Sequence, residues 1–498
     1  MVFEILYAHF YKKTFCQIGI FTSRRRKMER EGKGYNTKVN LRLIVLEMLL
    51  TEGTYSNIIV REVLNKYNYL LQQQKSFIKR LYEGTVERRI ELDYVINQYS
   101  KVKTDKMKPV ICAIMRMGVY QILYMSAVPD ASACDEAVKL AQRKGFSSLK
   151  GFVNGVLRNI ARNKGQISYP NLSVQYSMPE WIVDLWTDQI GAEKVQCVLK
   201  SLLVERPVTI RVRDIEEEVG IGTDALVSAI DQALQKQGGR MEPHPYLPYA
   251  YQIYKTDDLT KLPFYEHGGF VVQDISSMLA VEALDIKNMS IDKEYDIFKA
   301  VDICAAPGGK SMLLGDLLDR EGIERYAIWI RDISEKKLAV TKDNLRRCKV
   351  DNGIVQLWDA LEIDKEFVEN MDIVIADVPC SGLGVIGKKR DIKYHVTPKA
   401  IEDIIELQKG ILRIAASYVK PGGKLLFSTC TINCEENEKQ YEWIQQELKL
   451  VPVSLDSALP SCLHTDTTAK GYLQLLPGMH HADGFFISIF EKPVSKRE

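Results

Sequence analysis

The stretch Asp302-Ile-Cys-Ala-Ala-Pro-Gly-Gly-Lys310 decides the fold of the C-terminal half of the chain. It begins at the end of a predicted strand, Ala300–Cys304, and leads into a predicted helix. Adjacent glycines let a ligand approach the backbone, and a helix start offers N–H groups without partners in the helix. The spacing matches neither the G-x-G-x-x-G dinucleotide fingerprint nor the phosphate-binding P-loop. A Gly-Gly pair alone usually marks a turn, but the flanking Asp302, Pro307 and Lys310 predict a ligand-binding loop.

Strands and helices alternate from about residue 271 to the C-terminus, and a strong helical segment covers Pro398 to Val419. This alternation predicts a parallel, doubly wound α/β sheet. The further predicted strands are Tyr326–Arg331, Val355–Trp358, Asp372–Asp377, Lys424–Ser428 and Phe485–Phe490.

Two acidic residues follow successive predicted strands. Asp332 lies about 20 residues after Gly309, a spacing at which an acid commonly binds ribose hydroxyls. Asp359 follows the next strand and would face a base. Either acid alone would be a solvated loop residue, but ligands bind at the carboxyl ends of parallel strands. Their order therefore favours a nucleoside-containing ligand.

Two cysteines also follow strands, in Asp377-Val-Pro-Cys-Ser-Gly-Leu-Gly384 and Ser428-Thr-Cys-Thr-Ile-Asn-Cys-Glu-Glu-Asn437. A free cysteine is usually a small buried hydrophobe. Cys380 and Cys430 follow neighbouring strands, and this pairing favours a catalytic role for both. A thiolate that adds to C6 of a cytosine makes C5 nucleophilic toward a methyl group, and Asp377 could bind the N3–N4 edge of the base.

The thiol needs activation, since an ordinary cysteine has a pKa of about 8.5. A helix predicted to start near Asn433 would favour a thiolate at Cys430. The acidic Glu435 and Glu436 would oppose it, so the sequence leaves the net effect open.

Residues 40–162 show helical periodicity without strand patterns and predict an all-α domain. Its predicted features are a helix from Val110 to Met125 opened by Pro109, a capping box of Ser132 with Asp135, and a helix over Ser147–Ala161. Residues 163–180 are predicted to form a linker. Within 181–270, a strand is predicted over Val208–Val212, a helix over Thr223–Gln237, and a loop at Pro243, Pro245 and Pro248.

The formal net charge is only +2, so the whole chain does not indicate a nucleic-acid partner. One local segment does, because residues 140–165 contain basic residues and no acid. These residues are expected to contact RNA phosphates, although a solvated helix face is the plain alternative. They are Arg143, Lys144, Lys150, Arg158, Arg162 and Lys164.

The ten cysteines include no C-x-x-C pair, which argues against a structural zinc site or a disulfide framework and favours a reducing cytoplasm. No apolar run approaches the ~20 residues of a membrane span. We therefore expect neither a metal nor a membrane association. Residues 1–27 carry their charges in the wrong order for a signal peptide and are expected to be a tail or an over-long start before Met28.

These motifs together resemble the Sun/Fmu-type family of bacterial RNA cytosine-5 methyltransferases. The matching stretches are Asp302–Lys310, Asp377–Gly384, Ser428–Asn437, Val272–Ser277 and Asp483–Phe486, and Lys150–Asn159 resembles the NusB-like RNA-binding domain of such enzymes. The resemblance implies four parts: an extension (1–37), an all-α NusB-like domain (38–165), a small α/β RNA-binding subdomain with its linker (166–270), and a Rossmann-like class I methyltransferase domain (271–498).

The resemblance also implies roles for individual residues. Cys430 matches the nucleophile and Cys380 the residue that assists product release. The residues that match the S-adenosylmethionine site are Cys304, Ala305, Ala306, Pro307, Gly308, Gly309, Lys310, Asp332, Asp359 and Asp377. Val378 replaces the family's usual alanine, and Arg390 replaces a proline in a basic loop expected to contact RNA through Lys388, Lys389 and Arg390.

The expected reaction is methylation of C5 of a cytidine in 16S rRNA. Two alternatives stay open: a tRNA cytosine-5 methyltransferase, and an RNA-binding assembly or antitermination factor whose methyltransferase domain is idle. His480 and His481 are assigned to a loop without a catalytic role.

Overall fold

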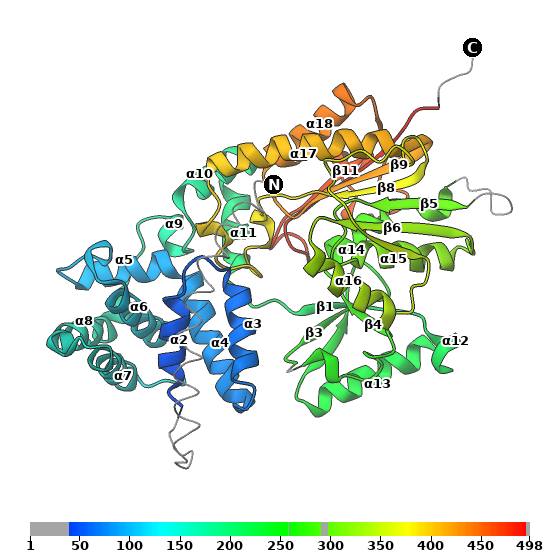
Figure 1. The fold of residues 1–498 in the computed structure, drawn as a ribbon. Helices are drawn as coiled ribbons and strands as arrows, with labels where there is room; N and C mark the ends of the chain where they lie inside the picture. The colour runs from blue at the N-terminus through cyan, green and yellow to red at the C-terminus, as the bar shows by residue number, and fades with distance from the viewer. Residues whose placement is uncertain (1–38, 257, 290–296, 495–498) are drawn as a thin grey trace. The chain divides into compact units, whose positions relative to one another are not determined.

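The computed structural model describes residues 39–256, 258–289 and 297–494. The chain divides into two compact units (Figure 1). The first holds the described residues up to Glu180 together with Lys389–Asp391, and the second holds Trp181–Lys388 and the chain from Ile392 onward. The expected extension over 1–37, with the start at Met28, lies outside the described residues.

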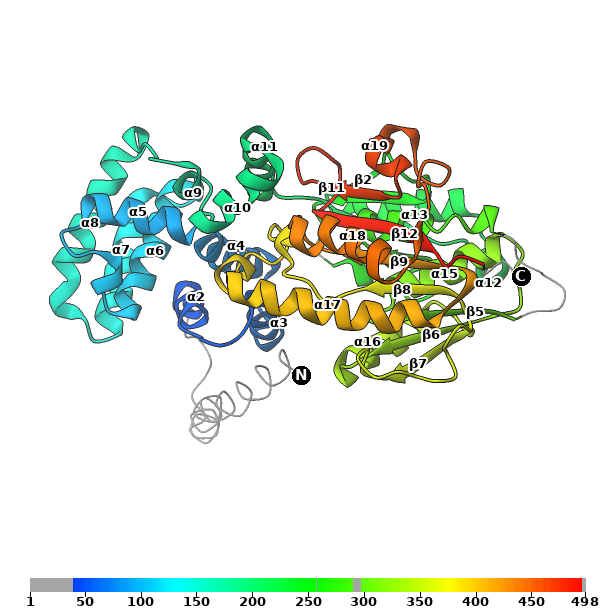
Figure 2. The same ribbon diagram turned by 90° about the horizontal axis from the view of Figure 1, so that it is seen from above.

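The helical pattern predicted over residues 40–162 is confirmed, and the first unit is all-α up to Glu180. Its central helix, α6, lies among the other helices of this unit (Figure 2) and contacts α2, α4, α5, α7 and α8. It buries Ile114, Met115 and Val119 in a single apolar core. The α-helices are α2 (Leu41–Leu49), α3 (Ser56–Lys66), α4 (Gln72–Glu87), α5 (Arg89–Tyr99), α6 (Pro109–Tyr124), α7 (Asp130–Arg143), α8 (Lys150–Asn163) and α9 (Leu172–Gln175).

Two local predictions in this region are wrong. The helix α7 begins one residue after Pro129, and no side chain caps it, so Ser132 lies inside the first turn and forms no capping box with Asp135. The segment 163–180 is not a plain linker, because it contains α9, whose N-cap Asn171 accepts a hydrogen bond from the Val174 N–H. An Asn cap of this kind can start a helix even in a Pro-containing segment.

The second unit begins within α10 (Glu180–Ile190), continues through α11 (Ala192–Leu202) and leads into a small antiparallel sheet of order β2-β3-β1-β4. The strand predicted over Val208–Val212 has these same bounds in the structure. The helix predicted over Thr223–Gln237 ends one residue earlier, at Lys236. The elements are β1 (Val208–Val212), α12 (Glu216–Val219), α13 (Thr223–Lys236), β2 (Arg240–Pro243), β3 (Ala250–Tyr254) and β4 (Phe270–Val272).

The large sheet of the second unit has the order β10-β12-β9-β8-β5-β6-β7, and β11 pairs with β12. Strands β7, β6, β5, β8 and β9 are parallel, as predicted. The strands are β5 (Phe298–Asp302), β6 (Tyr326–Asp332), β7 (Gly353–Leu357), β8 (Met371–Asp377), β9 (Val419–Thr429), β10 (Val451–Pro452), β11 (Tyr472–Leu475) and β12 (Phe485–Glu491).

The prediction that Phe485–Phe490 continues the parallel sheet is wrong, since β12 runs antiparallel to β9. Its pairing with β11 is also antiparallel, because the short connection between these two strands leaves no room for the helical crossover that a parallel pair requires. The C-terminal edge of the sheet is therefore antiparallel.

Helices cover both faces of the large sheet (Figure 1). On one face lie α17 (Pro398–Tyr418) and α18 (Glu438–Glu447), and on the other lie α14 (Ile275–Glu282), α15 (Gly309–Arg320) and α16 (Glu335–Arg347). The parallel strands bring the loops after β5, β6, β8 and β9 to one edge. In the described part of the chain, no helix is long and apolar enough to span a membrane.

Candidate active site

The two predicted cysteines lie against each other at this edge. The Sγ atoms of Cys380 and Cys430 are 3.1 Å apart, and the Cys430 N–H lies 3.3 Å from the Cys380 Sγ. Neither cysteine is in a disulfide. The hydrogen bond with Cys430, together with burial, raises the pKa of Cys380 well above its ordinary value.

The buried carboxylate of Glu436 joins the loops that carry the two cysteines. It accepts hydrogen bonds from the Ser381 N–H (2.7 Å), the Ser381 hydroxyl (2.6 Å) and the Asn433 side-chain amide (2.9 Å). Burial raises the pKa of Glu436. The sequence predicts Glu436 only as a charge near Cys430 and not as a site residue. Its position within the motif Ser428–Asn437 is the signal that could have identified it.

The helix expected near Asn433 is a single 3-10 turn, Cys434–Glu436, with Asn433 at its N-cap. The following α-helix, α18, begins only at Glu438. A three-residue turn has few aligned peptide dipoles, so the activation expected from a helix dipole at Cys430 is small.

Asp377 lies at the end of β8 and has two partners. Its Oδ1 accepts a hydrogen bond from the Ser428 hydroxyl (2.8 Å), and its Oδ2 lies 2.6 Å from the Lys310 Nζ. That ammonium group also lies 5.2 Å from the centre of the Phe485 ring. Lys310, predicted from the glycine-rich loop alone, thus lies beside the acid that begins the first cysteine motif.

The glycine-rich loop leads into α15 as predicted. Gly308 has φ +90°, a left-handed conformation that glycine adopts without strain, and a Cβ at this position would lie 2.8 Å from Thr341 Cγ2. The Ser311 hydroxyl donates to Asp302 Oδ2 (2.7 Å). Burial raises the pKa of Asp302 to about 7, helped by the nearby Asp377 and opposed by the Ser311 hydrogen bond and Lys310.

Asp332 contacts the same loop. Its Oδ2 lies 3.3 Å from the Ala306 N–H, and its Oδ1 accepts from the Ser334 N–H (2.8 Å). Asp359 accepts from the Leu361 N–H (2.9 Å) within its own loop after β7. Hydrogen bonds thus join Asp332 to the loop Cys304–Lys310, whereas no such bond joins Asp359 to it among the described residues.

The residues at this loop fit a polar cofactor. Arg211 donates to Gln273 Oε1 (3.0 Å), which fixes the orientation of the Gln273 amide. The buried Gln273 Nε2 has no hydrogen-bond partner in the described part of the chain and lies 3.6 Å from where a Cβ on Gly309 would be. A buried amide donor at a helix start suits an anionic ligand group.

The basic residues predicted to contact RNA in the first unit lie on α7 and α8, in the turn between them and just after α8. Arg143, Lys150 and Arg162 are exposed. The other three have acids nearby, which partly balance the charge of this surface: Lys144 lies 3.3 Å from Glu47, Arg158 lies 3.6 Å from Asp135, and Lys164 lies 2.8 Å from Asp130. The RNA contact stays a prediction.

The basic loop after the first cysteine motif is engaged in ion pairs. Lys388 Nζ lies 2.5 Å from Asp274 and 2.6 Å from Asp483, while Arg390 pairs with Glu87 at 3.0 Å inside the first unit. Lys389 is exposed.

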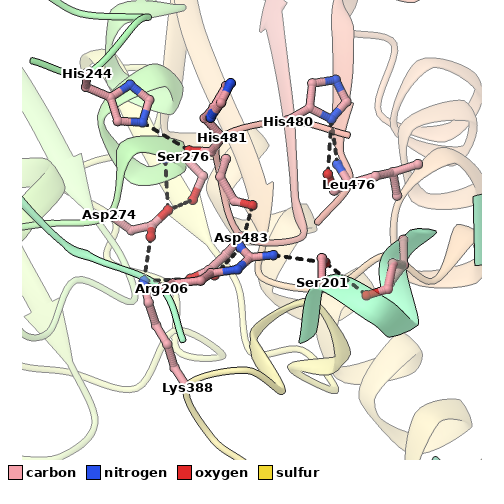
Figure 3. Close-up of polar contacts among 12 residues, drawn as sticks. Ser201, Arg206, His244, Asp274, Ser276, Lys388, Leu476, His480, His481 and Asp483 are labelled. Carbon is pink, nitrogen blue, oxygen red and sulfur yellow. Dashed lines mark hydrogen bonds and ion pairs between the residues drawn. The ribbon is translucent and has the colours of Figure 1, made fainter. Parts of the chain in front are cut away.

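The two histidines before β12 contact backbone atoms. His480 Nδ1 accepts from the Leu476 N–H (2.9 Å), and the His481 carbonyl lies 3.0 Å from His244 Nε2 (Figure 3).

Comparison with known proteins defines the class. The model of the family described as 16S rRNA methyltransferase RsmB/F matches residues 291–491, and that of the NusB family matches residues 40–162. A methyltransferase homolog protein from Pyrococcus horikoshii has the same fold over 65% of this chain and all of its own, with a TM-score of 0.52 and 25% identity.

Curated relatives identify the family within the RNA methyltransferases more narrowly. The probable ribosomal RNA small subunit methyltransferase B of Bacillus subtilis is 32% identical over 468 residues, which cover 91% of this chain and 99% of that protein. The protein of the same name from Synechocystis is 29% identical, over 91% of this chain and 98% of its own length. The chain therefore belongs to the family of ribosomal RNA small subunit methyltransferase B.

Proposed function

We propose that this protein transfers a methyl group from S-adenosylmethionine to C5 of a specific cytidine in 16S rRNA, in the cytoplasm. The observation that carries the proposal is the pair of thiols, 3.1 Å apart, at the ends of two neighbouring parallel strands. The names of the relatives support a small-subunit rRNA substrate. The family resemblance supports cytosine C5 as the target atom.

In the proposed mechanism, the thiolate of Cys430 forms a bond to C6 of the cytosine, and the electrons of the C5–C6 double bond make C5 nucleophilic. Bound S-adenosylmethionine supplies the electrophilic methyl group that C5 takes up. The cofactor's remainder would leave as S-adenosylhomocysteine. The C5 proton then passes to solvent water and the bond from C6 to sulfur breaks, which restores the double bond and the Cys430 thiolate. Cys380, in contact with Cys430, assists this release.

Asp377 is proposed to hold the base. Lys310 and Ser428 fix its carboxylate at two oxygens, so it presents a defined acceptor to the N3–N4 edge of the cytosine. A stacked base hides C6 from the thiol, so the target must be flipped out or already unpaired. The loop Cys304–Lys310 with Asp332 and Asp359 is proposed to hold the cofactor, and the basic surface of α7 and α8 to contact RNA phosphates.

The test is transfer of a labelled methyl group to naked 16S rRNA, intact small subunits and bulk tRNA in parallel. Label at C5 of one 16S cytidine supports the proposal. Label in tRNA alone would keep the chemistry and replace the substrate. Cofactor binding without label in any RNA would favour an assembly factor with an idle methyltransferase domain.

Replacement of Cys380 tests the release step. C380A is expected to accumulate a covalent protein–RNA adduct, visible as a slowly migrating band on a denaturing gel, because C6 stays bonded to Cys430. Rapid turnover by C380A without an adduct would contradict the assigned role.

A further inference from the structure

An ion-pair cluster near the cysteine loops has no role in the mechanism above. Lys388 Nζ bridges the carboxylates of Asp274 (2.5 Å) and Asp483 (2.6 Å), and Arg206 Nη1 reaches Asp483 (3.0 Å) and the Ala482 carbonyl (2.7 Å). Figure 3 shows Asp274, Arg206 and Asp483 gathered around the end of the Lys388 side chain. We call these four residues the Lys388 clamp.

The clamp joins segments that are distant in the sequence. Asp274 is the N-cap of α14 and accepts from the Ser276 N–H (3.0 Å). Arg206 precedes β1 and Asp483 precedes β12. Lys388 lies in the connection from β8 to α17, which also carries Cys380. The clamp thus holds the segment after Cys380 against the start of α14 and the start of β12.

A backbone path leads from the clamp to the cysteines. Gly484, next to Asp483, donates its N–H to the Gly384 carbonyl (3.0 Å), and Gly384 donates to the Cys430 carbonyl (3.1 Å). Lys388 lies one turn beyond Gly384, and its own N–H donates to the Val385 carbonyl (2.9 Å). The segment Asp483–Gly484 therefore holds the loop at two points, through a side chain and through the backbone.

The charges in the clamp depend on Lys388, whose side chain is half-exposed while Asp483 is buried. Burial of its ammonium group would lower the pKa of Lys388, but Asp274 and Asp483 together outweigh this and raise it. Burial and the neighbouring Asp274 raise the pKa of Asp483 to about 6, while Lys388 and Arg206 act against this. Without Lys388, only Arg206 would balance the carboxylates of Asp274 and Asp483. Repulsion between the two carboxylates would then separate the segments that carry them.

We propose that Lys388 is a positioning residue, which holds the loop from Cys380 to Lys388 so that the Cys380 thiol stays beside Cys430 during product release. This inference rests on the proposed function. It assigns Lys388 to the protein's own carboxylates, whereas the family resemblance predicts that it contacts RNA.

The test compares K388M, K388R and C380A in methyl transfer, adduct formation and S-adenosylmethionine binding by calorimetry. K388M is expected to lower kcat about 10- to 100-fold, because small displacements of a reacting group have effects of this size. It should accumulate the covalent adduct that C380A accumulates, with cofactor affinity unchanged. K388R keeps the charge and should restore turnover. K389M removes the neighbouring charge and should not accumulate adduct, whatever its effect on RNA affinity.

Two results with K388M would overturn the inference. One is a K388M enzyme that turns over without forming adduct although C380A accumulates it. The other is a K388M enzyme in which only the KM for RNA changes, which would indicate that Lys388 contacts an RNA phosphate instead. If C380A itself forms no adduct, the proposed chemistry fails, and this inference with it. Should K388M not fold, D274N takes its place, because asparagine caps helices as well as aspartate but leaves Lys388 one carboxylate short. D274N should accumulate adduct to a smaller extent, and its absence would overturn the inference.

Discussion

The Sγ atoms of Cys380 and Cys430 lie 3.1 Å apart, although the two cysteines belong to loops fifty residues apart in the chain. The contact arises because β8 and β9 are neighbouring parallel strands in which Asp377 pairs with Ser428. Cys380 follows Asp377 by three residues and Cys430 follows Ser428 by two, so both reach the same edge of the sheet. We therefore propose that both thiols act on one pyrimidine ring.

Replacement of Cys430 separates the nucleophile from the rest of the site. C430A is expected to lower methyl transfer more than about a thousandfold, because the covalent route is lost. Cofactor affinity should stay the same, as measured by calorimetry. The matched control is C434A, four residues further on, which should retain most of the activity. Substantial transfer by C430A would refute the nucleophile assignment.

The carboxylate of Glu436 is expected to stabilise the contact between the cysteine loops. One oxygen accepts from the Ser381 N–H and the other from both the Ser381 hydroxyl and Asn433. E436Q turns one acceptor into a donor and should cost about 1–3 kcal/mol of unfolding free energy. The exposed neighbour Glu435 gives the control, and E435Q should stay within about 0.5 kcal/mol of wild type. Urea denaturation at pH 8 measures both, and equal values for the two variants would contradict the prediction.

Gly384 and Gly484 allow two backbone segments to meet beside the cysteine loops. A Cβ on Gly384 would lie 2.0 Å from the Gly484 carbonyl oxygen, so G384A must displace backbone. We expect a loss of about 3 kcal/mol in stability together with a loss of activity. In the same loop, a Cβ on Gly387 would come no closer than 3.6 Å to other atoms, so G387A should cost under about 1 kcal/mol. Thermal unfolding of G384A and G387A measures the two losses of stability. A stable, active G384A would show that the close contact between Gly384 and Gly484 is not needed.

The parts of the fold that follow from local pattern could be predicted from the sequence. The strand Val208–Val212 is exact, and the helix from Pro398 ends one residue before its predicted end, because hydrophobic period and flanking Pro residues act locally. The antiparallel direction of β12 could not be predicted, since it depends on which strands β12 pairs with across the sheet and not on the composition of the strand itself.

The site residues could be predicted one by one, but not the network that joins them. The motifs identify Asp377, Cys380 and Cys430, which the sheet brings to one edge. The partners that fix them, such as Glu436 and Lys310, depend on side-chain geometry across strands, which spacing does not encode. For Lys388 the family resemblance predicts a contact with RNA, and only the fold reveals Asp274 and Asp483 beside it.

The buried Asp302 makes a prediction about pH and stability. Its pKa is raised to about 7, chiefly by burial, whereas in the unfolded chain it is near its ordinary value of 3.8. The folded protein therefore binds a proton that the unfolded chain has released, and Asp302 lowers stability progressively as the pH rises from about 4 to about 7. The difference between the two pKa values corresponds to about 4 kcal/mol of lost stability, reached above pH 7. D302N removes this loss, while a weaker bond to Ser311 lowers its stability by about 1 kcal/mol at every pH.

The D302N protein should thus gain stability relative to wild type as the pH rises from about 5 to about 8. Denaturant midpoints of both proteins across this range measure the difference, to which the other buried acids, Asp483 and Glu436, contribute equally in both. Parallel curves would mean that Asp302 is ionised throughout and that Lys310, 2.6 Å from Asp377, compensates both carboxylates. A diverging pair of curves would show instead that the loop keeps a destabilising acid, as expected of a residue retained for ligand binding rather than for folding.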